Sequence, residues 1–227
     1  MVRELDRVVF VPVIHTDPES VEKARATVIE IKPDVVAVEL DRLRYHQLSN
    51  PKEYDTDSQA AQLDMGVNDL MNQIALLEKN LGQETGSRAG TEMLSAIEAG
   101  RQVNAKIALI DRPVHITAQA LGQVPLDEIY RLTNLFPEAN EGISNGEAGN
   151  LMDMLKEDGA VDNLLSEFKK EFPVLADVLI DQRDEFIAKA LESILKDVDG
   201  KIVAVLGAGH IEGVYSKLQN LLHLSSS

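Results

Sequence analysis

The sequence contains no cysteine among its 227 residues. Disulfide bonds, thiol catalysis and zinc–thiolate sites are therefore excluded. It also lacks any apolar run near the roughly 18 residues of a membrane span, and residues 1–7 lack the apolar stretch of a signal peptide. We expect a soluble, cytoplasmic domain, with membrane attachment only through a segment absent from this chain.

The sequence has fewer basic than acidic residues. Lysine and arginine total 22 against 38 aspartate and glutamate residues, which gives a formal net charge of −16. Because nucleic-acid binders need a basic footprint, we expect no nucleic-acid partner. The same charge disfavours docking on anionic lipid. A solvated acidic surface is the simplest interpretation.

What the sequence does contain is an alternation of strand-forming and helix-forming segments. Apolar, β-branched runs predict four strands, at residues 7–14, 35–38, 106–110 and 201–206. A capped helix at 18–31, with Thr16 or Asp17 as its cap, joins the first two strands and predicts a parallel pair. We therefore predict one α/β domain over residues 1–227. It would have a small, mostly parallel or mixed sheet, with helices on both faces.

The region between the third and fourth strands, residues 114–198, is predicted to be a large, mainly helical insertion. Within it, three glycines at 142, 146 and 149 mark residues 137–150 as a loop or a lid. Outside it, helical periodicity appears at 58–81 and 89–102.

Polar side chains follow all four predicted strands. They are His15, Glu39, the Asp111-Arg112 pair and His210. Ligands of open parallel sheets bind beyond the carboxyl ends of the strands, so we expect these side chains to converge. His15, His210 and Glu39 would suit a divalent metal such as Zn, Mn or Co, with one position open for water. The same three groups could instead perform acid–base chemistry without a metal.

The stretch 201–210 ends in a glycine turn that presents a histidine. Gly207 and Gly209 allow a tight turn and the close approach of a ligand before His210.

Two charges on predicted helices point inward. Arg183 lies between Leu179 and Ile187 on the apolar stripe of a helix at 173–197, and Glu92 shares a face with Ala96. A buried arginine must be paired, so one interpretation is a structural ion pair. The functional interpretation is that Arg183 or Arg112 orients a carboxylate or stabilises developing negative charge.

Several stretches in order resemble the TraB family, which includes the pheromone-shutdown proteins. They are IHTDPESVEKARATVIEIKPDVVAVELDRLRY, AGTEMLSAIEAGRQVNAKIALIDRPVHIT, LIDQRDEFIAKAL and KIVAVLGAGHIEGV. The family is similar to a wider group with the Tiki metalloproteases, the ChaN-like proteins and the erythromycin-esterase-like proteins. That group carries two G-x-x-H motifs and a glutamate.

Gly207 to His210 matches the second of these motifs, and Glu39 matches the glutamate. The first motif stands as Pro12-Val-Ile-His15, with proline in place of glycine. Because proline also fixes a bend, we expect His15 still to be presented. Further polar positions of the family pattern are matched by Glu92, Arg112, Arg183 and Asp184. Members often carry a C-terminal membrane region, which implies membrane tethering in full-length relatives.

Three hypotheses about function follow. The resemblance implies a metal-dependent hydrolase of the peptidase type that acts on short peptides, with Glu39, Glu92, Arg112 and Arg183 as catalytic residues. The alternative is a non-catalytic module that sequesters a peptide or small molecule, with residues 137–150 closing over it. A third hypothesis is an assembly domain whose buried charges are only structural. A homo-oligomer is left open as a partner.

Overall fold

Four strands form one parallel sheet in the order β1-β4-β2-β3. In this computed structural model, residues 2–50 and 65–224 are described. The strands span Val8–Val13 (β1), Val35–Val38 (β2), Lys106–Leu109 (β3) and Ile202–Gly207 (β4). These bounds confirm the four predicted strands, and the sheet is fully parallel. All six residues of β4, one of the two central strands, are buried.

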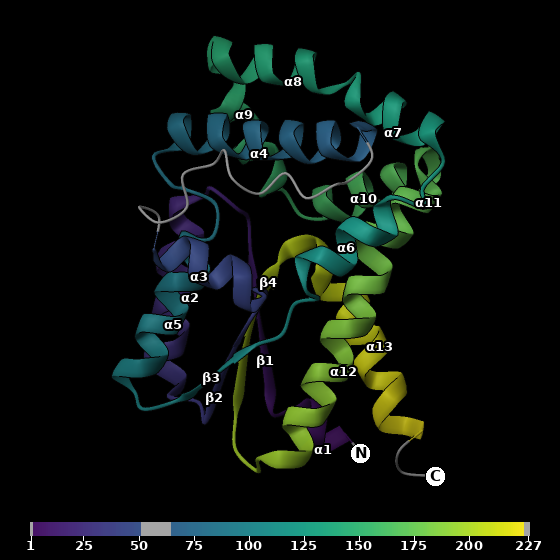
Figure 1. Cartoon of the computed structure of the whole chain (residues 1–227). Helices are drawn as coiled ribbons and strands as arrows, with labels where there is room; N and C mark the ends of the chain where they lie inside the picture. The colour runs from purple at the N-terminus through teal and green to yellow at the C-terminus, as the bar shows by residue number, and fades with distance from the viewer. Residues whose placement is uncertain (1, 51–64, 225–227) are drawn as a thin grey trace.

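Helices cover both faces of the sheet, as predicted (Figure 1). Alternate strand residues point to opposite faces. On one face Ala204 and Leu206 pack with α12 (Gln182–Asp197) and α13 (Ile211–Leu224). On the other, Val203 and Val205 pack with α2 (Pro18–Ile31) and α5 (Thr91–Gln102). Each face therefore has its own apolar cluster.

The helices that follow β1 and β2 begin at side-chain caps. The Asp17 carboxylate accepts hydrogen bonds from the backbone N–H groups of Glu19 and Ser20 and so starts α2. In the same way Asp41 accepts from the N–H of Arg44 at 2.7 Å and starts α3 (Arg42–Ser49). Asp17 lies four residues after the end of β1 and Asp41 three residues after the end of β2, so the caps fix the backbone beside His15 and Glu39.

A third apolar cluster lies in a helical layer at the end of the molecule opposite both termini (Figure 1). Its helices are α4 (Met65–Thr85), α6 (Val114–Leu121), α7 (Leu126–Thr133), α8 (Phe136–Gly142), α9 (Ala148–Leu155), α10 (Ala160–Glu171) and α11 (Pro173–Ala176). All but α4 lie between β3 and β4, which confirms the predicted helical insertion. Part of the helix predicted at 58–81 lies outside the described residues.

The expectation of a loop or lid at residues 137–150 is wrong. This stretch is helical: α8 continues through a π-helical turn, η1 (Ile143–Glu147), into α9. Ile143, Ala148 and Met152 are buried, and α8, η1 and α9 all contact α4. Packing of this apolar face therefore outweighs the low helix propensity of glycine. Only Gly146, at φ 91°, leaves the helical conformation.

The helix predicted at 173–197 contains a π-helical turn, η2 (Asp177–Asp181), between α11 and α12. The remaining short helices are α1 (Val2–Leu5) and a 3₁₀ turn, η3 (Ala208–His210), between β4 and α13. No helix within residues 2–50 and 65–224 combines the length and the apolar character needed to cross a membrane.

Candidate functional site

The strand ends meet at one cavity of about 220 Å³. The loops after β1, β2 and β4 contribute His15, Glu39 and His210, while α12 contributes Arg183. The other lining residues are Leu40, Arg44, Glu78, Gly90 and Met93. Four of the residues singled out in the sequence therefore line one cavity.

His15 is held by Glu92. Its Nδ1 atom lies 2.6 Å from Oε1 of Glu92, whose side chain is 1% exposed. Glu92 sits in the first turn of α5 and also accepts from the backbone N–H of Gly90, so the helix N-terminus stabilises its charge. Burial opposes a charge on His15, but the neighbouring carboxylate of Glu92 outweighs it and raises the pKa of His15.

His210 is held in the same way by Asp184. Its Nδ1 atom lies 2.6 Å from Oδ1 of Asp184, which is in the first turn of α12 and almost fully buried. The other carboxylate oxygen, Oδ2, has no hydrogen-bond partner among the described residues. It lies where a Cβ on Gly213 would be, so this glycine makes room for Asp184.

Glu39 contacts Arg183, His210 and the backbone of Gly207. Its Oε1 atom is 2.5 Å from Nη2 of Arg183 and 3.3 Å from Nε2 of His210. Its Oε2 atom accepts from the backbone N–H of Gly207 at 2.7 Å. Burial opposes its charge, but His210, Arg183 and His15 outweigh burial and lower the pKa of Glu39 to about 2.

Arg183 is neutralised by two carboxylates. Besides Glu39 it donates to both oxygens of Asp111, from Nε at 3.1 Å and from Nη2 at 2.9 Å. These neighbours raise the pKa of Arg183 despite its burial. The predicted inward phase of Arg183 is thus real, and its partners are the carboxylates that follow β2 and β3. Glu92 is not one of them.

The two glycines of the turn differ in position. A Cβ on Gly207 would lie 3.3 Å from Oε2 of Glu39 and 3.5 Å from Nε2 of His15, so Gly207 lies among the site side chains. A Cβ on Gly209 would meet Leu165 of α10 at 3.3 Å, away from them. Of the two, only Gly207 therefore lies beside the site side chains.

Arg112 lies apart from this group. Its guanidinium donates to the hydroxyl of Thr117, the side chain of Gln182 and the carbonyl of Val178 in η2. It does not line the cavity. Its contacts hold the π-helical turn that precedes Arg183, so its place in the structure is one of support.

Comparison with known proteins places the chain in a family. The model of the TraB/PrgY/gumN family matches residues 6–223. The chain belongs to this family. An uncharacterised protein of Methanocaldococcus jannaschii is 29% identical over 210 residues, which cover 91% of this chain and 52% of that protein.

TraB domain-containing proteins of Bos taurus and Homo sapiens are 26% and 24% identical over 235 residues. Those matches cover 92% of this TraB-family chain and 61% of each relative. The chain thus spans between about half and three fifths of the length of these curated relatives.

The donor atoms of this TraB-family site do not fit a metal as they stand. Both histidines have a carboxylate on Nδ1, an arrangement that orients Nε2 for a metal. The third donor, Glu39, is already held by Arg183 and the Gly207 N–H. Across residues 2–50 and 65–224, no group of three or more His, Asp or Glu side chains converges as a metal site would require.

The chain differs from the first family motif at Pro12, three residues before His15. Pro12 lies inside β1, an edge strand, where a missing N–H is tolerated. The turn itself falls at residues 14–17, closed by a hydrogen bond from Asp17 N to Ile14 O. Thr16 occupies it at φ 66°, a conformation that is strained for a β-branched residue. This strained turn presents His15.

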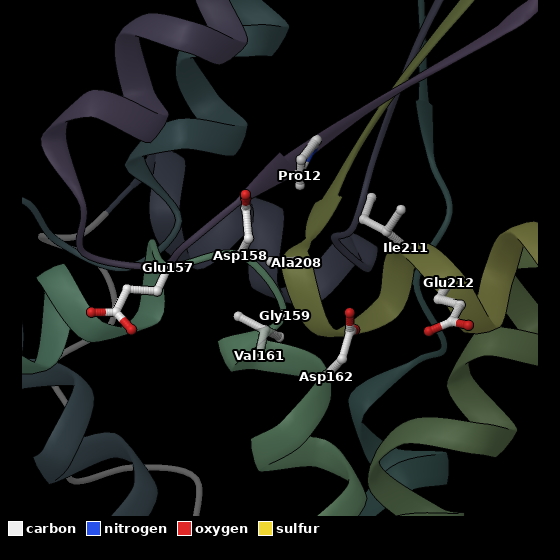
Figure 2. A pocket seen from close by; sticks show the side chains of 9 residues that line it. All are labelled: Pro12, Glu157, Asp158, Gly159, Val161, Asp162, Ala208, Ile211 and Glu212. Atoms are coloured by element: carbon white, nitrogen blue, oxygen red, sulfur yellow. The ribbon is translucent and has the colours of Figure 1, made fainter.

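A second cavity of about 330 Å³ lies beside Ala208 of the Gly207–His210 turn (Figure 2). Pro12 and Ala208 lie in its wall, together with four acidic side chains, Glu157, Asp158, Asp162 and Glu212. None of the site residues predicted from the TraB-family pattern lines it.

Sequence reasoning missed Leu40, Arg44, Glu78, Gly90 and Met93 of the first cavity. A signal existed for Arg44, because it lies one turn into the helix that Asp41 caps directly after β2. No signal existed for Glu78, because its place depends on how α4 packs over the strand ends.

Proposed function

We propose that this TraB-family domain is a hydrolase that acts on short peptides or similar small substrates by acid–base catalysis. The observation that carries the proposal is the pair of histidines at one cavity, each held at Nδ1 by a buried carboxylate at 2.6 Å. Such a carboxylate accepts the Nδ1 proton and leaves Nε2 to exchange protons with a reactant.

The two histidines would take opposite roles. In its neutral form, with the proton on Nδ1 toward Asp184, His210 has an unprotonated Nε2 that can accept the proton of the attacking water, and we assign it that role. The hydroxide that results adds to the substrate carbonyl, and the carbon–nitrogen bond then breaks. His15 has a raised pKa and would donate the proton that the leaving amine needs. Arg183 lines the same cavity, and we assign it the stabilisation of the oxyanion.

A metal-dependent form of the same hydrolase stays a prediction. It requires Glu39 to turn away from Arg183 and toward the Nε2 atoms of His15 and His210. Titration of the wild type and His15→Ala with Zn²⁺, Mn²⁺ and Co²⁺ by calorimetry tests it. Stoichiometric binding that His15→Ala abolishes would support it, and no binding by the wild type would remove it.

Hydrolysis is tested with a mixture of short peptides, followed by mass spectrometry. We expect His210→Ala to lower the rate about 100-fold or more, which is the usual contribution of a general base. His115→Ala is the matched control, because His115 is exposed on α6, outside the cavity. Cleavage that persists in both His210→Ala and His15→Ala would refute the proposal.

The second candidate, binding without turnover, is favoured by one observation. Glu39 already has Arg183, His210 and the Gly207 N–H as partners, as a carboxylate with a purely structural role would. A binding module would keep its affinity for a peptide in Glu39→Gln and would release no product in any variant.

A further inference from the structure

The two arginines of the 220 Å³ cavity are held very differently. Arg183 is 19% exposed in its side chain and contacts two carboxylates. Arg44 is 43% exposed, and its acidic partner among the described residues is Glu78, at 3.5 Å from Nη2. That distance is at the limit of a hydrogen bond. The guanidinium of Arg44 is thus the loosely held cation of this cavity.

The backbone of Arg44 is fixed even though its guanidinium is loosely held. Its N–H donates to the capping Asp41 at 2.7 Å, and only residues 39–41 separate β2 from α3. Glu39 lies five residues earlier on the same connection, and both side chains line the cavity. Arg44 therefore has a set position relative to the reacting groups, which a recognition residue needs.

The electrostatics of the cavity favour an anionic group at Arg44. Its positive charge reaches His15 strongly enough to oppose protonation of that ring. The chain as a whole carries a net charge of −16, so an anionic ligand needs a local cation to enter. The Arg fork matches a carboxylate at two nitrogens, and Glu78 places a carboxylate beside this fork.

We propose that Arg44 binds the terminal carboxylate of the ligand and that this carboxylate displaces Glu78. The cavity, at about 220 Å³, is smaller than the pockets of about 300–1,000 Å³ that enclose drug-sized ligands, so it admits one end of a peptide. Cleavage, unlike binding, rests on the proposed function: the hydrolase would cleave short peptides from their free C-terminus. Glu78 acts as an internal competitor.

The test measures binding of N-acetylalanine and of its C-terminal amide, N-acetylalaninamide, by NMR titration. We expect the wild type to prefer the acid by about 10-fold to 100-fold, the range for a charge-assisted hydrogen bond. Arg44→Gln should lose this preference. Glu78→Gln should bind the acid more tightly than the wild type, because the internal competitor is gone. Arg42→Gln is the matched control, since Arg42 is exposed on the same helix.

Three results would overturn the proposal: equal binding of acid and amide, no binding of the acid, or a preference that survives in Arg44→Gln. Inorganic phosphate is the competing probe. Arg44-dependent binding of phosphate, without binding of the acid, would also overturn it. A thermal unfolding scan shows whether Arg44→Gln remains folded, and Glu78→Gln tests the competition independently. Because these probes need no turnover, absence of peptide hydrolysis would refute the hydrolase and leave the role of Arg44 standing.

Discussion

Nη2 of Arg183 lies 2.5 Å from Oε1 of Glu39, across 144 residues of sequence. The same nitrogen also contacts Asp111. One guanidinium on α12 thus ties together the loops after β2 and β3, because each of them contributes a carboxylate to it. The pair thus lines the cavity and holds α12 against the end of β2.

Replacement of Arg183 should destabilise the fold strongly. Arg183→Met leaves the carboxylates of Glu39 and Asp111 without their cation, and breaking a buried pair costs about 3–5 kcal/mol. The free energy of unfolding in urea measures this loss. Arg42→Gln, at an exposed position, should change it by less than about 0.5 kcal/mol. Equal stability of the two variants would show that the pair is dispensable.

Acid stability should depend on Glu39. Its pKa falls from an ordinary 4.5 to about 2, so it binds a proton less readily in the folded state. Its contribution of about 3 kcal/mol is present above pH 4.5 and is lost as the pH falls toward 2. In Glu39→Gln the loss of stability between these pH values should be smaller. Parallel acid curves for wild type and variant would contradict the assignment.

Much of the site could be anticipated from strand ends, for a simple physical reason. A run of buried β-branched residues identifies a strand, and a parallel sheet brings the carboxyl ends of its strands to one edge. That reasoning locates His15, Glu39 and His210. The phase of Arg183 on an apolar helix stripe likewise identifies it as inward and paired.

The remaining contacts depend on tertiary packing, which local patterns do not encode. Glycines 142, 146 and 149 read as a loop, yet the segment stays helical because Ile143 and Met152 are buried. The partner of Glu92 is His15, although helix phase indicates only that Glu92 points inward. Arg112 follows β3 as a site residue would, but its guanidinium turns toward η2.

The titration of His15 should report its contact with Glu92. The raised pKa means that the folded state holds this proton more tightly than an ordinary histidine of pKa 6.5. The resulting stabilisation is full below pH 6.5 and is lost as the pH rises through the folded-state pKa. An NMR titration of the imidazole should give a lower pKa in Glu92→Gln. Glu98→Gln, an exposed glutamate on the same helix, should leave it unchanged.

The position of Asp184 depends on Gly213, and a single methyl group tests it. A Cβ at residue 213 would lie 1.9 Å from Oδ2 of Asp184, which forces the carboxylate or α13 to move. We expect Gly213→Ala to lower the free energy of unfolding by about 1–3 kcal/mol, as overpacking does, and to break the contact with His210.

Gly149→Ala is the matched control, because its Cβ would meet nothing within 4 Å and its backbone is helical. Alanine there should stabilise α9 by about 0.5–1 kcal/mol. If Gly213→Ala were as stable as Gly149→Ala and left the His210 imidazole resonances unchanged, then Asp184 would not be confined by Gly213. The carboxylate would then have room to leave His210, and its role in fixing that ring would fail.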